Sequence, residues 1–166
     1  MPKEVSTDIR PARRGALEEL GKSGPAAAGT ISQMLDDPAF SDEASELVIA
    51  LVKAGGEAIG EELKRRLQQD LAFWRSTGPS LSEGWWNEDP RPEAPLRNRY
   101  ARTYQLILGI EQTHYQAALN TAMQLRDFWR SLPPFNDPSG LNQIAEECDK
   151  LIGQLQANAT TDRRGA

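Results

Sequence analysis

The sequence predicts an all-α protein built from antiparallel helix pairs that stack on one another, and two observations support this prediction. Apolar residues recur every three or four positions through most of the chain, which is the spacing of one face of an α-helix. Two segments also match each other: LGKSGPAAAGTISQML at 20–35 aligns with LVKAGGEAIGEELKRRL at 51–67, so that Leu20 lies over Leu51. A self-match at a period near 31 residues is typical of helical-repeat arrays.

The helices and breaks follow from apolar spacing and from the positions of glycine and proline. The first two pairs turn at Gly21–Pro25 and at Gly55–Gly56, because glycine ends helices and proline suits a first helical turn. A third, diverged pair is expected to turn near Gly109 and Thr113. We predict one domain, 1–158, with helix pairs at about 8–36, 41–75 and 96–132, an irregular insertion at 76–95, a last helix at 141–157, and a disordered tail at 159–166.

Composition limits the functions open to this chain. The 166 residues fit a single domain, and a net charge of −5 disfavours non-specific binding to nucleic acid or to an anionic membrane. No apolar run is long enough to span a bilayer, and the charged N-terminal segment does not resemble a secretory signal. A single cysteine, Cys148, fits a reducing compartment. We therefore expect a cytoplasmic protein.

The segment Gly21-Lys22-Ser23 matches the end of a nucleotide-binding P-loop. That motif needs a glycine five residues before the second glycine, a preceding strand and a following helix. Here the upstream glycine is Gly15, one position too far, and the residues between have helical spacing. The equivalent segment of the second pair, LVKAGGEA, keeps a lysine and a glycine without a phosphate motif. A turn between helices is the better interpretation.

The pattern LG-x-x-G-x-x-A, recurring near 31 residues, resembles HEAT-like repeats, most closely the short bacterial repeats of the phycobilisome-lyase type. The matching residues are Leu20, Gly21, Gly24 and Ala27, then Leu51, Gly55 and Ala58, while Val52 replaces the glycine of the second copy. The resemblance implies a short right-handed α-solenoid with a C-terminal capping helix, acting as a scaffold that binds partners. The lyase activity of some relatives is not carried over, because no catalytic motif here matches one.

Tryptophans in and near the insertion are candidate partner-binding residues. Trp85 and Trp86 are adjacent, and Trp74 lies at the end of the preceding helix. Tryptophan is enriched among binding hot spots, so these three could anchor a partner protein. The structural alternative is that the insertion folds back and its tryptophans cap the end of the stack.

Arginines and a tyrosine after the insertion form a candidate nucleic-acid or phosphate site. Arg97, Arg99 and Arg102 alternate with Tyr100, and basic residues interleaved with aromatic rings bind single strands in other proteins. The alternative is that Tyr100 belongs to the apolar face and that Arg99 and Arg102 pair with acidic residues of the 76–95 insertion. Arg65-Arg66 is expected to be part of a solvated helix face.

Nothing in the sequence indicates catalysis, a metal site or a cofactor. His114 is the only histidine, no nucleophile motif accompanies it, and Cys148 is expected to be a buried structural thiol. We predict a non-enzymatic protein–protein interaction module or an adaptor subunit of a larger assembly. The alternative is a nucleic-acid-associated accessory protein that uses the Arg97–Arg102 face.

Overall fold

The computed structural model describes residues 10–56, 58–81, 85, 95–132 and 143–164. Within these residues the chain forms helices and no β-strand, which confirms the all-α prediction. The α-helices are α1 (Arg10–Lys22), α2 (Ala28–Asp36), α3 (Ala44–Ala54), α4 (Ile59–Thr77), α6 (Pro95–Thr113), α7 (Leu119–Ser131) and α8 (Gln143–Arg164). Short 3-10 helices are η1 (Pro25–Ala27), η2 (Pro38–Glu43), η3 (Gly78–Ser80) and η4 (Gln116–Ala118).

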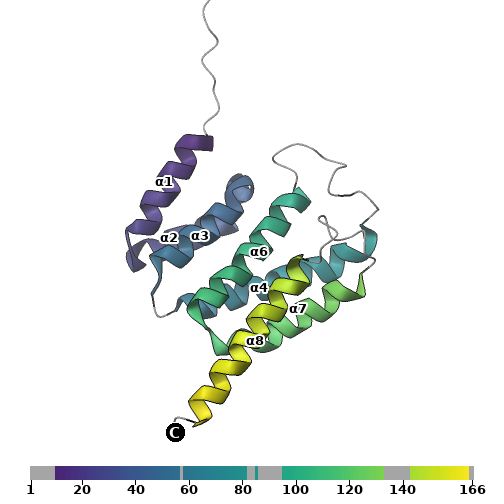
Figure 1. The fold of residues 1–166 in the computed structure, drawn as a ribbon. Helices are drawn as coiled ribbons and strands as arrows, with labels where there is room; N and C mark the ends of the chain where they lie inside the picture. The colour runs from purple at the N-terminus through teal and green to yellow at the C-terminus, as the bar shows by residue number, and fades with distance from the viewer. Residues whose placement is uncertain (1–9, 57, 82–84, 86–94, 133–142, 165–166) are drawn as a thin grey trace, which may run out of the picture.

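The helices form two layers (Figure 1). In the first layer α1 packs against α3, α3 against α6, and α6 against α8. In the second, α4 packs against α7 and also against α6, while α2 lies against α3. Each helix pair therefore contacts the next pair along the chain, which is consistent with an all-α helical repeat. The right-handed solenoid with a C-terminal cap stays a prediction.

The turns of the first two pairs share one backbone conformation. Gly24 has φ 80° and ψ −165°, and Gly55 has φ 70° and ψ −150°. These two glycines align in the sequence repeat, and a positive φ favours glycine because other residues carry a Cβ. In the third pair the positive φ, 51°, belongs to His114. The third turn therefore lacks the glycine signature that makes the first two recognisable.

Side chains separated by about one repeat face each other across neighbouring pairs. Three polar contacts join residues that are 30 positions apart. They are Arg13–Glu43, Ser32–Glu62 and Asp36–Arg66. Because equivalent positions of stacked repeats lie side by side, these contacts follow from the period seen in the sequence.

The third turn was expected near Gly109 and Thr113. Thr113 is the last residue of α6, whereas Gly109 lies inside this helix and was wrongly assigned to the turn. A Cβ added there would come within 2.7 Å of Cγ2 of Val52 on α3. Gly21 plays the same part on the other side of α3, where a Cβ would lie 3.1 Å from the Ala50 backbone. Both glycines allow two helices to approach closely. The third turn itself lies at His114, five residues after Gly109.

The tail predicted to be disordered from residue 159 is helical as far as Arg164, where α8 ends. Neither glycine nor proline interrupts the chain between Gly153 and Gly165, so nothing in this stretch ends the helix. The Thr160 hydroxyl donates to the carbonyl of Gln156, which satisfies its hydrogen-bonding group within the helix. The polar composition of residues 159–164 therefore did not justify the prediction of disorder.

An aromatic cluster fills the space between α4, α6 and α7. The ring centroids of Trp74 and Trp129 lie 5.1 Å apart in an edge-to-face arrangement, and Tyr100 lies 5.6 Å from Trp129. Trp85, which follows η3, contacts Trp74 at 6.2 Å. All four side chains are buried, so Trp85 joins the 76–95 segment to the core.

No helix among the described residues has the length and apolar character needed to cross a membrane.

Two carboxyl groups meet where α6 packs against α8. Burial, followed by hydrogen bonding to Glu147 and its charge, raises the pKa of Glu111 from 4.5 to about 7, while Lys150 opposes this rise. Nζ of Lys150 lies 3.2 Å from Oε2 of Glu147. Between these two pKa values the folded protein keeps a proton that the unfolded chain releases.

The free energy of unfolding is therefore expected to fall as the pH rises from 4.5 to about 7. In Glu111→Gln the amide donates to Glu147 without a titrating proton, so this part of the pH profile should flatten. The variant should also be more stable than the wild type above about pH 7. Urea unfolding at a series of pH values measures both effects. Parallel pH profiles of the free energy of unfolding for the two proteins would contradict a raised pKa of Glu111.

Candidate functional site

The predicted arginine segment lies at the start of α6 and surrounds a buried carboxylate of α4. Asp70 is fully buried, and its Oδ1 lies 2.9 Å from Arg99 Nη2 and 3.3 Å from Arg102 Nε. The Thr103 hydroxyl donates to Oδ2 at 2.8 Å. Burial raises the pKa of Asp70, and the charges of Arg102 and Arg99 oppose that rise. Two guanidinium groups therefore share one buried carboxylate.

A second buried arginine joins α4 to α2. Arg66 is fully buried, so its predicted place on a solvated face was wrong, whereas Arg65 is exposed as expected. Arg66 Nε donates to Glu62 at 2.7 Å and Nη1 donates to Asp36 at 3.0 Å. Its Nη2 donates to the carbonyl of Ser32 at 2.8 Å. This network spans the space between the second helices of the first two pairs.

A cavity of about 300 Å³, the arginine pocket, lies beside these clusters. Its walls differ in charge, because α6 contributes Arg99 and Arg102 while the end of α2 contributes Asp36 and Asp37. The guanidinium of Arg99 lies 4.5 Å from the centre of the Phe73 ring, which fixes its position. The cavity is lined by Leu35, Asp36, Asp37, Pro38, Ser41, Ala44, Phe73, Pro95, Asn98, Arg99 and Arg102.

A larger hollow of about 520 Å³, the turn groove, lies where the first two inter-helix turns meet. Its lining residues are Pro25, Ala28, Gly29, Ser32, Leu51, Gly55, Gly56, Ala58, Ile59 and Glu62. Glu62 is the charged member of this set. Burial raises the pKa of Glu62, but hydrogen bonds from Ser32 and Arg66 outweigh it and lower the pKa. The resulting carboxylate is neutralised by arginine, so the groove presents an apolar, glycine-rich surface.

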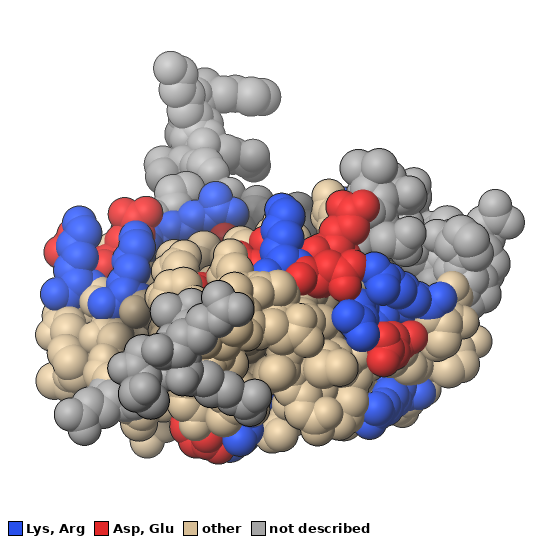
Figure 2. All heavy atoms as spheres, turned by 60° about the horizontal axis from the view of Figure 1, so that its bottom comes forward, with Lys and Arg blue, Asp and Glu red and all other residues tan. Residues whose placement is uncertain are grey.

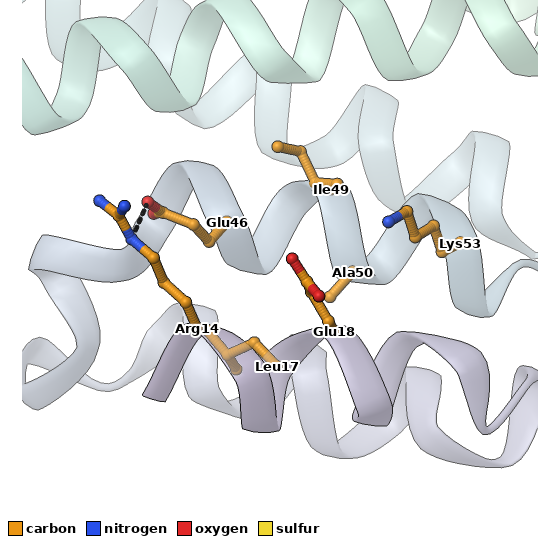
Figure 3. A pocket seen from close by; sticks show the side chains of 7 residues that line it. All are labelled: Arg14, Leu17, Glu18, Glu46, Ile49, Ala50 and Lys53. Atoms are coloured by element: carbon orange, nitrogen blue, oxygen red, sulfur yellow. Dashed lines mark ion pairs between the residues drawn. The ribbon is translucent and has the colours of Figure 1, made fainter. Parts of the chain in front are cut away.

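A third hollow lies between α1 and α3 (Figure 3). Its volume of about 100 Å³ is below the 300–1,000 Å³ typical of ligand pockets. Arg14 reaches across to Glu46, with 3.3 Å between Nε and Oε1, and Ile49 points away from α1. Ile49 is 39% exposed, and a single exposed aliphatic side chain is ordinary on a protein surface. This hollow is therefore a weak candidate.

Surface charges of opposite sign are interleaved on the face shown in Figure 2. The bottom of Figure 1 comes forward in this view, and a broad area there carries neither acidic nor basic side chains. The basic side chains are accompanied by acidic ones and do not form a continuous stripe. Nucleic-acid binding depends on clustered positive charge, so this face does not favour it.

The tryptophans proposed as partner anchors lie mainly in the core. Trp74 is 0% exposed and Trp85 is 4% exposed, so neither presents its ring to solvent. These positions favour the structural alternative for both residues. Trp86 lies outside the described residues. In the arginine segment, Tyr100 is buried in the aromatic cluster, Arg97 and Arg99 are half-buried, and Arg102 is buried.

The candidates for chemistry lie in different parts of the fold: the Gly21-Lys22-Ser23 segment at the end of α1, His114 after α6, and Cys148 on α8. Gly21 and Lys22 are the last two residues of α1, so this segment ends a helix and does not follow a strand, as the sequence indicated. Cys148 is fully buried, and burial together with Asp149 raises the pKa of its thiol to about 12. No group of three or more potential metal ligands occurs among the described residues.

Comparison of the chain with protein-family models, curated proteins and solved structures finds no match. What characterises the chain is its all-α arrangement of packed helix pairs, together with the arginine pocket and the turn groove. The resemblance to HEAT-like repeats rests on the matching residues alone.

Neither the turn groove nor the burial of Arg66 was predicted from the sequence. The repeat does carry a signal for Arg66, since Ser32 and Asp36 lie 34 and 30 positions before it. Pairing opposite charges that lie about one repeat apart would have predicted the contact between Asp36 and Arg66. The groove itself had no comparable signal, because its surface is made largely by small residues and by the shape of two turns.

Proposed function

We propose that this protein is a non-enzymatic interaction module that binds an apolar segment of a partner protein in the turn groove. The observation that carries the proposal is the groove itself, which has a volume of about 520 Å³. Ala28, Gly29, Gly55 and Gly56 line it with little side-chain bulk, so another backbone can approach closely. The proposed role is that of a cytoplasmic adaptor subunit within a larger complex.

The charge distribution supports a protein partner over a nucleic acid. Arg99 and Arg102 are engaged with Asp70, and the facing wall of the arginine pocket carries Asp36 and Asp37. A polyanion would meet these carboxylates as well as the arginines. The apolar turn groove lies next to the same α2 segment and predicts binding that tolerates salt, because exposed charges do not dominate it.

Glutamate at position 29 is expected to block the groove. Gly29 is an exposed α2 residue at which an added Cβ meets no atom within 4 Å, so Gly29→Glu places a carboxylate in the groove without a clash. Burying that unpaired charge against an apolar segment should weaken binding at least about tenfold. Capture of a partner by the tagged protein, followed by its affinity for each purified variant, measures the effect.

Gly153→Glu is the matched control. Gly153 is an exposed glycine of α8 whose added Cβ also meets no atom within 4 Å. Glutamate has a higher helix propensity than glycine, so neither substitution should unfold the protein. The proposal predicts wild-type affinity for Gly153→Glu. Equal affinities for both variants, or recovery of nucleic acid that salt removes, would contradict it.

A further inference from the structure

The interface between the second and third turns is closed by an aromatic ring. Tyr115, the second residue after α6, packs on Gly60, the second residue of α4. A Cβ added at Gly60 would lie 2.4 Å from Cδ2 of Tyr115, so the ring lies directly on the glycine backbone. The Tyr115 hydroxyl donates to Oε2 of Glu61. Glycine at position 60 therefore lets the ring approach the helix.

The interface between the first and second turns has the same plan without the ring. The second residue after α3 is Gly56, and the second residue of α2 is Gly29. Both glycines line the turn groove. A Cβ added at Gly29 meets no atom within 4 Å, whereas Gly60, its equivalent in the next pair, is covered by Tyr115. The turn groove thus occupies the position that Tyr115 fills at the next interface.

The size and the lining of the groove suit an aromatic side chain. Its volume of about 520 Å³ falls within the 300–1,000 Å³ typical of ligand pockets. Pro25, Leu51 and Ile59 supply apolar contacts around the two glycines. An aromatic side chain buries about 150–250 Å² and dominates the energetics of such contacts. The groove also continues the row of inter-turn contacts, since Ile59 lines it and precedes Gly60 in α4.

We propose that the turn groove receives an aromatic side chain of the partner segment, which packs there as Tyr115 packs on Gly60. This inference rests on the proposed function and specifies the chemistry of the partner, an apolar segment that presents an aromatic residue. The ring lies against the backbone of Gly29 and Gly56 and completes the row of inter-turn packing. An aliphatic side chain fills the same place less well, because it lacks a flat face to lie against a glycine backbone.

The test is an NMR titration of the intact protein that follows the backbone amide signals of its glycines. The probes are N-acetyl-tyrosinamide and N-acetyl-leucinamide, which differ in the side chain alone. We expect saturable shifts of the Gly29 and Gly56 signals, with a dissociation constant at least about fivefold lower for the tyrosine amide. Gly60 should not respond in the wild type, because Tyr115 covers it. Equal affinities for the two amides, or no saturable shift, would overturn the inference.

Two variants locate the response. Gly29→Glu should weaken the Gly56 response to the tyrosine amide at least about tenfold, whereas Gly153→Glu should leave it unchanged. Tyr115→Ala uncovers Gly60 and should add a saturable response there to the same amide. Absence of that response in the folded variant would overturn the equivalence of the two interfaces. If Tyr115→Ala fails to fold, the wild-type titration and the two glutamate variants still decide the outcome.

Failure of this inference is distinguishable from failure of the proposed function. If the two amides bind equally while Gly29→Glu still weakens partner binding, the groove holds a partner segment without a preference for an aromatic ring. If Gly29→Glu has no effect on partner binding, the proposed function fails, and the inference about the partner fails with it.

Discussion

Replacing Asp70 with alanine is expected to lower the free energy of unfolding by about 3–5 kcal/mol. The carboxylate is fully buried and lies between Arg99 and Arg102. Its removal leaves two guanidinium groups in a poorly solvated place without their shared counter-charge. The hydroxyl of Thr103 also loses the acceptor that it contacts at 2.8 Å. Urea unfolding of the wild type and the variant measures the difference.

Asp127→Ala supplies the matched control for this prediction. Asp127 is 67% exposed in its side chain and pairs with Arg126 on the surface, so its removal should cost less than about 1 kcal/mol. Similar losses for the two variants would show that Asp70 is not the buried counter-charge described above.

Trp74→Ala is expected to cost about 3–5 kcal/mol, because it empties the centre of the aromatic cluster. The Trp74 ring is 0% exposed and meets Trp129 edge to face. Its indole N–H donates to Thr103 at 3.0 Å, and Thr103 in turn donates to Asp70. The substitution therefore affects both the aromatic packing and the polar cluster below the arginine pocket.

Trp74→Phe separates these two contributions. Phenylalanine keeps much of the packing and loses the hydrogen bond to Thr103, so its cost should be smaller than that of alanine. Urea unfolding of both variants provides the comparison. A loss below about 1 kcal/mol for Trp74→Ala would contradict a structural role for this tryptophan and would reopen its role as a partner anchor.

The all-α class could be predicted because each helix carries its own periodic apolar face. The first two turns could be predicted because Gly24 and Gly55 supply the positive φ that each turn requires. The third turn could be placed only near Gly109 and Thr113, because the residue with the positive φ there, His114, is not a glycine. Gly109 was misassigned because a glycine that admits a neighbouring helix looks, in sequence, like one that ends a helix.

The candidate site could be predicted only in part. Arg99 and Arg102 were singled out by their spacing, but the partner of both, Asp70, lies about 30 residues away on another helix. The two hollows depend on how α2, α4 and α6 are placed in space, which local patterns do not specify. Burial of Trp74 and Trp85 likewise follows from packing between distant segments.

Site-specific crosslinking tests the central claim, that a partner protein occupies the turn groove, most directly. A photoreactive residue at Ala28, which lines the groove, is compared with the same residue at Gly153 on α8. A discrete protein adduct is expected from position 28 only, and it should be lost when Gly29→Glu is added. Equal adducts from both positions, or none from position 28 while the wild type captures a partner, would contradict it.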